Sequence, residues 1–200
     1  MKTILVTGPI GSGKSAVCAL LKERGIPVYD ADARTKGLYD RRPALVAALE
    51  QALALPLTTP EGRLDRARLA ARIFSDPEAR SRVEALVYPA VLQDFRRWRS
   101  RQKGAPFVVL ESAVLLSKPA FDGLADAAVL VTAPQELRLA RVMARDGCTR
   151  LQALARMAAQ DCPWEKAQVV LPNDGTPEAL SAAVQRCFFD KNSYLCKIIE

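Results

Sequence analysis

An eight-residue run near the N-terminus combines residue types and spacing that suit the binding of nucleotide phosphates. It extends from Gly8 to Ser15, reads GPIGSGKS and matches the pattern G-x-x-x-x-G-K-[ST] at every required position. Glycines allow a tight loop whose N–H groups point at phosphate oxygens, the lysine can reach the β- and γ-phosphates, and the serine hydroxyl can ligate Mg²⁺. The pattern therefore predicts a nucleoside triphosphate site, with Ser15 as the metal ligand, made by Gly11, Ser12, Gly13, Lys14, Ser15 and Ala16.

Acidic residues follow two short apolar runs that have the composition of strands. Asp30 and Glu111 each end such a run, and Asp32 lies two residues after Asp30. Along an extended chain, Asp30 and Asp32 point to the same side. One of this pair could accept the proton of an acceptor hydroxyl while the other holds a metal's water shell or a substrate group. Glu111 stands where a carboxylate would approach the water shell of Mg²⁺. The alternatives are that Asp32 caps a helix at Ala33 and that Glu111 is a solvated strand end.

Three arginines share one face of a predicted helix in the second half of the chain. Arg138, Arg141 and Arg145 are spaced i, i+3 and i+7, and the helix ends at the break Asp146-Gly147-Cys148. Arginines before such a break are typical of the lid of a small kinase, where their charge stabilises the phosphoryl group in transfer. A surface helix with salt bridges is the alternative.

The elements that must position these residues alternate between strands and helices. A strand at 3–7, the glycine loop, a helix ending at Gly25 and a strand at 26–29 form a strand–helix–strand unit, which implies parallel strands. A long helical stretch then interrupts the alternation. The order indicates a three-layer α/β domain with a helical insertion. Further strands are predicted at 107–110, 127–132 and 169–171, and helices at 134–146, from Thr149 onward and at 177–189, whereas 190–200 has no assignable pattern.

The net charge of +7 comes entirely from the helical stretch. Residues 33–103 hold 15 Lys and Arg against 8 Asp and Glu, whereas the rest of the chain holds 14 of each kind. A basic segment suits an anionic ligand, although a solvated helical face gives the same count. The densest part, 96–103, contains Trp98 and could bind nucleic acid. A solvated helix end explains it more simply, so we expect no nucleic-acid partner.

Several classes of protein are excluded by what the sequence lacks. It contains no histidine, which excludes Ser-His-Asp and Cys-His mechanisms. No apolar run approaches the roughly 20 residues that span a bilayer, and Gly8 comes too early for a signal peptide, so we expect a cytoplasmic protein with no membrane partner. Five cysteines without a C-x-x-C pair indicate reduced thiols. The GTPase motifs D-x-x-G and N-K-x-D are absent too, which favours a small-molecule kinase.

Several short runs occur in an order that is typical of one family. The most specific are the D-A-D step at 30–32, the run R-x-x-x-R-D-G at 141–147 and the run R-x-x-x-Q at 156–160. The other matching runs are the glycine loop itself, Gly62–Arg66, Ile73–Phe74, Tyr88–Val91 and Asn173–Gly175. The matches extend over nearly the whole chain, up to about Phe189, and through them the chain resembles the dephospho-CoA kinases.

The resemblance implies a P-loop kinase fold with five parallel strands. The nucleotide-binding core would comprise 1–32 and 104–189, with a helical CoA-binding insertion at 33–103 and a lid at about 141–160. The implied reaction is the phosphorylation of the ribose 3′-hydroxyl of dephospho-CoA by ATP, with Mg²⁺ as cofactor. The basic insertion suits this substrate because dephospho-CoA carries a pyrophosphate. We expect a monomeric enzyme.

The family also implies roles for individual residues of this chain. Asp32 corresponds to the proposed general base, and Arg141 and Arg145 correspond to lid arginines that act with Lys14 and Mg²⁺ on the γ-phosphoryl group. Asn173 and Gly175 correspond to the segment near the ATP adenine.

Three positions depart from the family pattern. Tyr88 replaces the usual histidine before Pro89, Ser117 replaces the acid that ends a P-L-L-F-E run, and Lys36 replaces a frequent arginine. These changes bear on substrate contacts more than on the reaction. Another nucleoside or nucleotide kinase is the alternative function, followed by a nucleotide-gated protein that binds nucleic acid.

Overall fold

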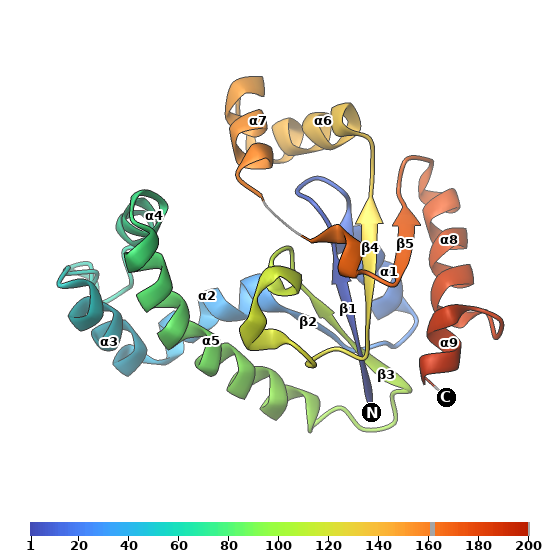
Figure 1. The fold of residues 1–200 in the computed structure, drawn as a ribbon, viewed down its shortest axis with the longest axis horizontal. Coiled ribbons are helices and arrows are strands. Elements are labelled where there is room, and N and C mark those ends of the chain that lie inside the picture. The colour runs from blue at the N-terminus through green and yellow to red at the C-terminus, as the bar shows by residue number, and fades with distance from the viewer. Residues whose placement is uncertain (161–162, 200) are drawn as a thin grey trace. The chain divides into compact units, whose positions relative to one another are not determined.

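A computed structural model describes residues 1–160 and 163–199, and the chain divides into two compact units (Figure 1). The core unit consists of Met1–Asp30 and Gln102–Glu200, and the insertion unit consists of Ala31–Arg101. The core unit contains the strands β1 (Lys2–Thr7), β2 (Val28–Asp30), β3 (Phe107–Glu111), β4 (Ala127–Thr132) and β5 (Val169–Pro172), and the helices α1 (Lys14–Glu23), α6 (Gln135–Asp146), α7 (Arg150–Ala158), α8 (Pro177–Phe189) and α9 (Tyr194–Ile199). The insertion unit contains α2 (Ala31–Arg41), α3 (Pro43–Leu53), α4 (Arg66–Ser75) and α5 (Pro77–Arg99).

The five strands form one parallel sheet in the order β2-β3-β1-β4-β5 (Figure 1). β1 lies in the middle and pairs with β3, where Lys2 is opposite Phe107, and with β4, where Ile4 is opposite Ala127. The chain passes from β1 to β2 on one side of β1 and later crosses to β4 on the other. In sheets of this kind the ligand crevice lies where the direction of winding changes, at the carboxyl ends of the strands. The predicted five-stranded parallel sheet is confirmed.

The two faces of the sheet are covered by different segments because side chains alternate along each strand. Ile4 and Val6 of β1 are fully buried in a cluster that includes Val17 of α1 and Val184 of α8. Leu5 points to the opposite face, where it lines a small cavity together with Leu115, Leu116 and Phe121. These three residues belong to two short 3₁₀ turns, η1 (Leu115–Ser117) and η2 (Pro119–Phe121).

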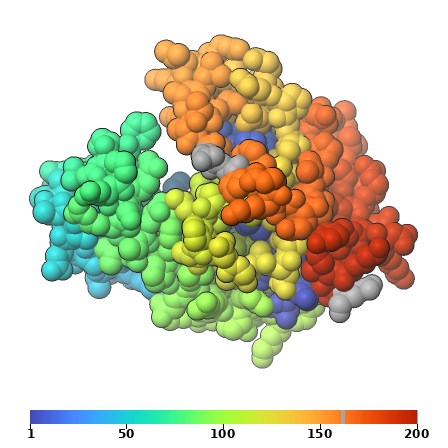
Figure 2. All heavy atoms as spheres, in the orientation of Figure 1, coloured from blue at the N-terminus to red at the C-terminus, as the bar shows by residue number. Residues whose placement is uncertain are grey.

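The helices α6 and α7, which follow β4, pack against each other through a small apolar cluster. Its buried members are Leu139 and Val142 of α6 and Ala153 of α7. In Figure 2 the two helices form a continuous block of atoms at the top of the view. The predicted start of α7 is confirmed, since Thr149 and Gln152 form a reciprocal capping box.

In the insertion unit, α5 packs against α2, α3 and α4. The buried side chains that these three helices contribute include Leu38, Leu49 and Leu69. α5 is the longest helix of the described chain and is rich in charge. None of the helices in residues 1–160 and 163–199 has the length together with the apolar character needed to cross a bilayer.

The boundaries of two elements, α2 and the end of the chain, differ from those expected from the sequence, and α5 passes through a proline. α2 begins at Ala31, directly after β2, so Asp32 lies within the first helical turn and neither continues the strand nor caps a helix at Ala33. α5 continues through Pro89, because the lost backbone bond is outweighed by the burial of Val87 and Val91 on either side. The end of the chain forms α9, which is held by the burial of Leu195 in the core cluster.

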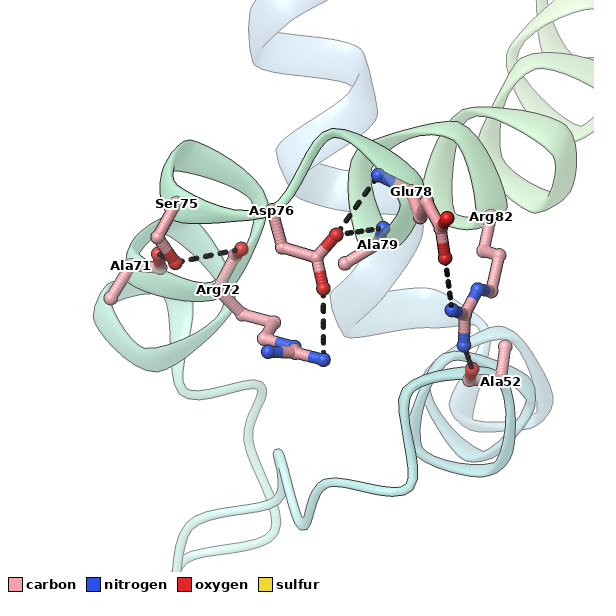
Figure 3. Close-up of polar contacts among 8 residues, drawn as sticks. All are labelled: Ala52, Ala71, Arg72, Ser75, Asp76, Glu78, Ala79 and Arg82. Carbon is pink, nitrogen blue, oxygen red and sulfur yellow. Dashed lines mark hydrogen bonds and ion pairs between the residues drawn. The ribbon is translucent and has the colours of Figure 1, made fainter.

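Asp76 connects α4 to α5 in the insertion unit (Figure 3). Its carboxylate accepts hydrogen bonds from the backbone N–H groups of Glu78 and Ala79, at 2.9 and 3.0 Å, and so caps the N-terminus of α5. The same carboxylate pairs with Arg72 of α4 at 3.0 Å. The Ala79 N–H group, followed by the charge of Arg72, lowers the pKa of Asp76. One side chain therefore fixes the end of one helix relative to the start of the next.

We expect the substitution Asp76→Ala to lower Tm by a few degrees, because α5 loses its cap. Glu78→Ala is the matched control, since it removes only the exposed pair with Arg82. A lowered pKa in the folded state means that the stabilisation is present at neutral pH and is lost as the pH falls through the lowered value. The Tm difference between the parent and Asp76→Ala should therefore shrink on acidification. Calorimetric scans between neutral and acidic pH measure it, and equal effects of both substitutions would contradict the capping role.

Candidate active site

The polar residues predicted from the core sequence meet at the carboxyl edge of the sheet. The loop from Gly8 to Gly13 follows β1, Glu111 ends β3, α6 follows β4 after two residues, and Asn173 follows β5 directly. Parallel strands bring all these carboxyl ends to one edge. Segments more than a hundred residues apart in the sequence therefore supply a common site.

Two positions of the loop require glycine, both for the backbone conformation and for lack of space beside the Cα atom. Gly11 and Gly13 have φ values of 80° and 95°, which L side chains rarely adopt. A Cβ atom on Gly11 would lie 2.5 Å from the carbonyl oxygen of Arg138, and one on Gly13 would collide with the Asn173 amide. Gly13 also leaves the N-terminus of α1 without a side-chain cap. A tight loop that leads into an uncapped helix N-terminus fits the phosphates of a nucleotide.

Lys14 and Ser15, the first two residues of α1, bond to different neighbours. The Lys14 Nζ donates to the carbonyl oxygens of Gly8 at 2.9 Å and Pro9 at 3.4 Å. The Ser15 hydroxyl donates to Glu111 Oε1 at 3.0 Å. A hydroxyl next to a carboxylate is a set of oxygen donors that suits Mg²⁺. The structure thus brings Glu111 to the residue predicted to bind the metal.

Cys18, one turn further along α1, also contacts this carboxylate. It is buried, and burial followed by the charge and hydrogen bond of Glu111 raises the pKa of the Cys18 thiol. A thiol with a raised pKa stays protonated at neutral pH and is a poor nucleophile. This agrees with the prediction of a reduced cysteine used for packing. Cys148, Cys187 and Cys196 are free thiols as well, whereas Cys162 lies outside the described residues.

Arg141 and Asn173, both from the C-terminal part of the core unit, hold the glycine loop near the N-terminus. Arg141 Nη1 donates to the carbonyl oxygens of Gly11 and Ser12, both at 3.4 Å, and its Nη2 donates to the Asn173 carbonyl oxygen at 3.2 Å. The buried Asn173 amide donates to the Ser12 carbonyl oxygen at 2.7 Å. The side chain of Asn173 thus contacts the loop backbone.

A cavity of 210 Å³ opens in front of the loop. One of the residues that line it, Arg145, has a side chain that is 63% exposed. The Arg145 Nε donates a hydrogen bond to the Asp146 carboxylate at 2.7 Å. This bond raises the pKa of Arg145 and lowers that of Asp146, so both groups are charged at neutral pH. The cavity is lined by six of the residues discussed so far, together with Val142: Gly11, Gly13, Lys14, Ser15, Arg141 and Arg145.

The remaining predicted residues do not line this cavity. Asp30 ends β2 in the core unit, whereas Asp32 is exposed in the first turn of α2 and belongs to the insertion unit. Gly175 lies just before Thr176, the N-cap of α8. Ala16 is in the first turn of α1, where its N–H group donates to the Gly13 carbonyl oxygen.

One residue that contacts the loop had no role assigned from the sequence. Gln160 follows α7 and accepts a hydrogen bond from the Ile10 N–H group at 2.6 Å. The only signal for it was its place at the end of the R-x-x-x-Q run. Its partner lies 150 residues earlier in the chain, which no local pattern could show.

The chain is similar to one family over most of its length. A sequence profile described as dephospho-CoA kinase matches residues 2–178. A dephospho-CoA kinase from Anaeromyxobacter dehalogenans is 38% identical over 195 residues, which cover 95% of this chain and 92% of that protein.

Two solved structures resemble the chain in three dimensions. A crystal structure of a protein from Thermus thermophilus has 40% sequence identity and a TM-score of 0.78, and the match covers 92% of this chain and 94% of that one. The dephospho-CoA kinase from Campylobacter jejuni, at 22% identity and a TM-score of 0.63, matches over 93% of this chain and 95% of its own, and supports the fold.

Proposed function

The chain belongs to the dephospho-CoA kinase family, and from this premise we infer that it is a kinase that uses ATP to convert dephospho-CoA to coenzyme A. The observation that carries this inference is the arrangement around the loop. Lys14, Ser15, Arg141 and Arg145 line one cavity beside a helix N-terminus, which is what the transfer of a γ-phosphoryl group needs.

We propose that the loop from Gly11 to Ala16 binds the phosphates of ATP. Lys14 would leave the carbonyl oxygens of Gly8 and Pro9 to bind the β- and γ-phosphates. Arg141 and Arg145 would neutralise the charge that spreads over the phosphoryl group during transfer. Ser15 and Glu111 would hold Mg²⁺, which would supply positive charge to neutralise the phosphates.

We propose that Asp32 is the general base, which takes up the proton of the acceptor, the ribose 3′-hydroxyl. A carboxylate is needed because the attacking oxygen loses its proton as the bond to phosphorus forms. Asp32 is exposed in the first turn of α2, so its carboxylate is accessible to a substrate held by the insertion unit.

We propose that the insertion unit binds the rest of this substrate. A cavity of 720 Å³ within that unit is lined by Tyr39, Val46 and Leu64 and by the cations Arg63 and Arg66. Arg66 is also paired with Asp40 at 3.0 Å. The carboxylate of Asp40 also lines this cavity, whose two guanidinium groups and apolar side chains together suit an organic molecule that carries phosphates.

Two departures from the family pattern have local partners in this chain. Burial, followed by a hydrogen bond to Glu84, raises the pKa of Tyr88, so its hydroxyl keeps its proton at neutral pH where a histidine could titrate. The Ser117 hydroxyl donates to the Val114 carbonyl oxygen at 2.8 Å and closes the turn η1. Both side chains are therefore used for local structure.

A panel of acceptors tests the proposed function. ADP release from ATP and Mg²⁺ is measured with dephospho-CoA, with nucleosides, with nucleoside monophosphates and with an oligonucleotide. We expect turnover with dephospho-CoA alone, and mass spectrometry should place the new phosphate on the ribose 3′ position. Faster turnover with a nucleoside or nucleotide would replace the proposal with another kinase activity.

The basic charge of residues 33–103 should act on the anionic substrate. KM for dephospho-CoA is therefore expected to rise with salt, because salt screens the field that attracts it. Arg96, Arg97 and Arg99 occupy the last turn of α5, where cations also favour the helix dipole. Replacing all three with glutamine should leave kcat/KM for dephospho-CoA within about threefold of the parent at 0.15 M salt. Tight binding of an oligonucleotide by the parent, lost in this variant, would instead indicate a nucleic-acid role.

A further inference from the structure

Gln160 connects three segments of the core unit that are remote in sequence. It lies two residues after Ala158, where α7 ends. Its Oε1 accepts from the Ile10 N–H group in the glycine loop at 2.6 Å, and its Nε2 donates to the Ala113 carbonyl oxygen at 3.3 Å. Ala113 lies two residues after Glu111, which bonds Ser15. The side chain is half-buried and both ends of its amide are satisfied by backbone.

The bond to Ile10 also determines the direction of the Pro9 carbonyl group. A trans peptide is planar, so its N–H and C=O groups point in opposite directions. When Gln160 fixes the N–H of the Pro9–Ile10 peptide, the Pro9 oxygen is directed to the other side. There it accepts from the Ser12 N–H group at 3.1 Å and from Lys14 Nζ at 3.4 Å.

The side chain of Ile10 is held by the same helices as its backbone. It packs against the cluster that contains Leu139, Val142 and Ala153. Arg141 of α6 bonds the next two carbonyl oxygens of the loop, those of Gly11 and Ser12. Three sets of contacts therefore hold the tip of the loop: the Gln160 bond to the Ile10 N–H group, the packing of the Ile10 side chain, and the bonds from Arg141.

We propose that Gln160 is a positioning residue that sets the phosphate-binding loop, through the Pro9–Ile10 peptide, in the conformation that receives ATP. This proposal rests on the proposed function only in taking ATP as the ligand. Gln160 touches no reacting atom, and its effect on catalysis is exerted through the loop. Loss of its amide would let the peptide rotate and would remove the Pro9 oxygen from Ser12 and Lys14.

Gln160→Met tests the role, because methionine keeps the length of the side chain and removes both hydrogen bonds. The dissociation constant of ATP with Mg²⁺ is measured by titration calorimetry without dephospho-CoA. We expect it to rise about 10-fold, the cost of one buried hydrogen bond and a looser loop. KM for dephospho-CoA should stay within about twofold, and exchange of the Ile10 amide hydrogen should accelerate more than exchange in β1.

Gln152→Met is the matched control. It removes a glutamine bond of similar length at the start of the same helix, to the Thr149 N–H group at 3.0 Å, and leaves the loop intact. ATP affinity should be unchanged in this variant. Equal weakening in both variants would show that the stability of α7 alone matters, and unchanged affinity in Gln160→Met would overturn the proposal outright.

Gln160→Glu removes one of the two hydrogen bonds and keeps the other. This variant also tests the proposal if the methionine variant does not fold. Glutamate keeps an acceptor for the Ile10 N–H group and loses the donor to Ala113. Exchange of the Ile10 amide should remain slow, as in the parent, and fast exchange would count against the proposal. Because ATP binding is measured alone, a selective loss in Gln160→Met stands even if the acceptor panel identifies a substrate other than dephospho-CoA.

Discussion

Replacing Lys14 with alanine is expected to lower kcat by ~10²–10³-fold while the protein stays folded. The ammonium group is the one cation that α1 directs at the loop, and in the transition state it would stabilise charge on the phosphoryl oxygens. It donates to two backbone carbonyl oxygens of the loop, and its side chain is half-buried and outside the apolar core, so its removal should leave the fold intact. Single-turnover kinetics with saturating ATP and dephospho-CoA measure the loss.

Lys22→Ala is the control for this experiment. Lys22 lies in the last turn of the same helix and is exposed, so its loss removes a positive charge from α1 at a distance from the loop. Activity should remain close to that of the parent, and circular dichroism should show the same helix content in both variants. Near-parental turnover in Lys14→Ala would refute the assignment of the loop to nucleotide phosphates.

Asp32→Asn should lower kcat by roughly 10²–10⁴-fold with little change in ATP affinity. Asparagine has the shape of aspartate but cannot take up the proton of the acceptor hydroxyl. Because Asp32 is exposed on the first turn of α2, the substitution should leave Tm nearly unchanged. A loss of kcat without a loss of ATP binding or stability is the signature of a missing base.

Asp30→Asn tests which carboxylate of the pair is the base. Asp30 is the last residue of β2, opposite Glu111 in the register of β3, and is therefore close to the residue that bonds Ser15. We expect its substitution to affect the dependence of rate on Mg²⁺ concentration more than kcat at saturating Mg²⁺. A larger fall in kcat at position 30 than at position 32 would transfer the role to Asp30.

The features that the sequence predicted well are those with a local cause. The glycine spacing of the loop requires positive φ, and the capping box at Thr149 needs only residues within one helical turn. The positions of β1, β3 and β4 followed from apolar runs, because strands in the middle of a sheet covered on both faces are buried. The family resemblance also rests on short local runs, of which the glycine loop is one. The parallel sheet that the resemblance implies agrees with the structure.

Contacts between distant segments could not be predicted in the same way. The i, i+3, i+7 spacing placed Arg141 on a helix face, but its bonds to the loop and to Asn173 depend on how α6 follows β4. The same holds for Gln160 and Ile10. The assumption of an extended chain misplaced Asp32, since nothing in the D-A-D step shows that the helix starts at Ala31 rather than later.

The position of β1 in the sheet has a consequence for synthesis on the ribosome. β1 is translated first, yet its partners β3 and β4 begin at Phe107 and Ala127. The apolar residues of the strand must therefore remain unpaired until most of the chain has emerged, whereas the helices of the insertion make contacts that are local in sequence. During that interval β1 is the segment that a chaperone would have to shield, and truncation before β4 should leave a product prone to aggregation.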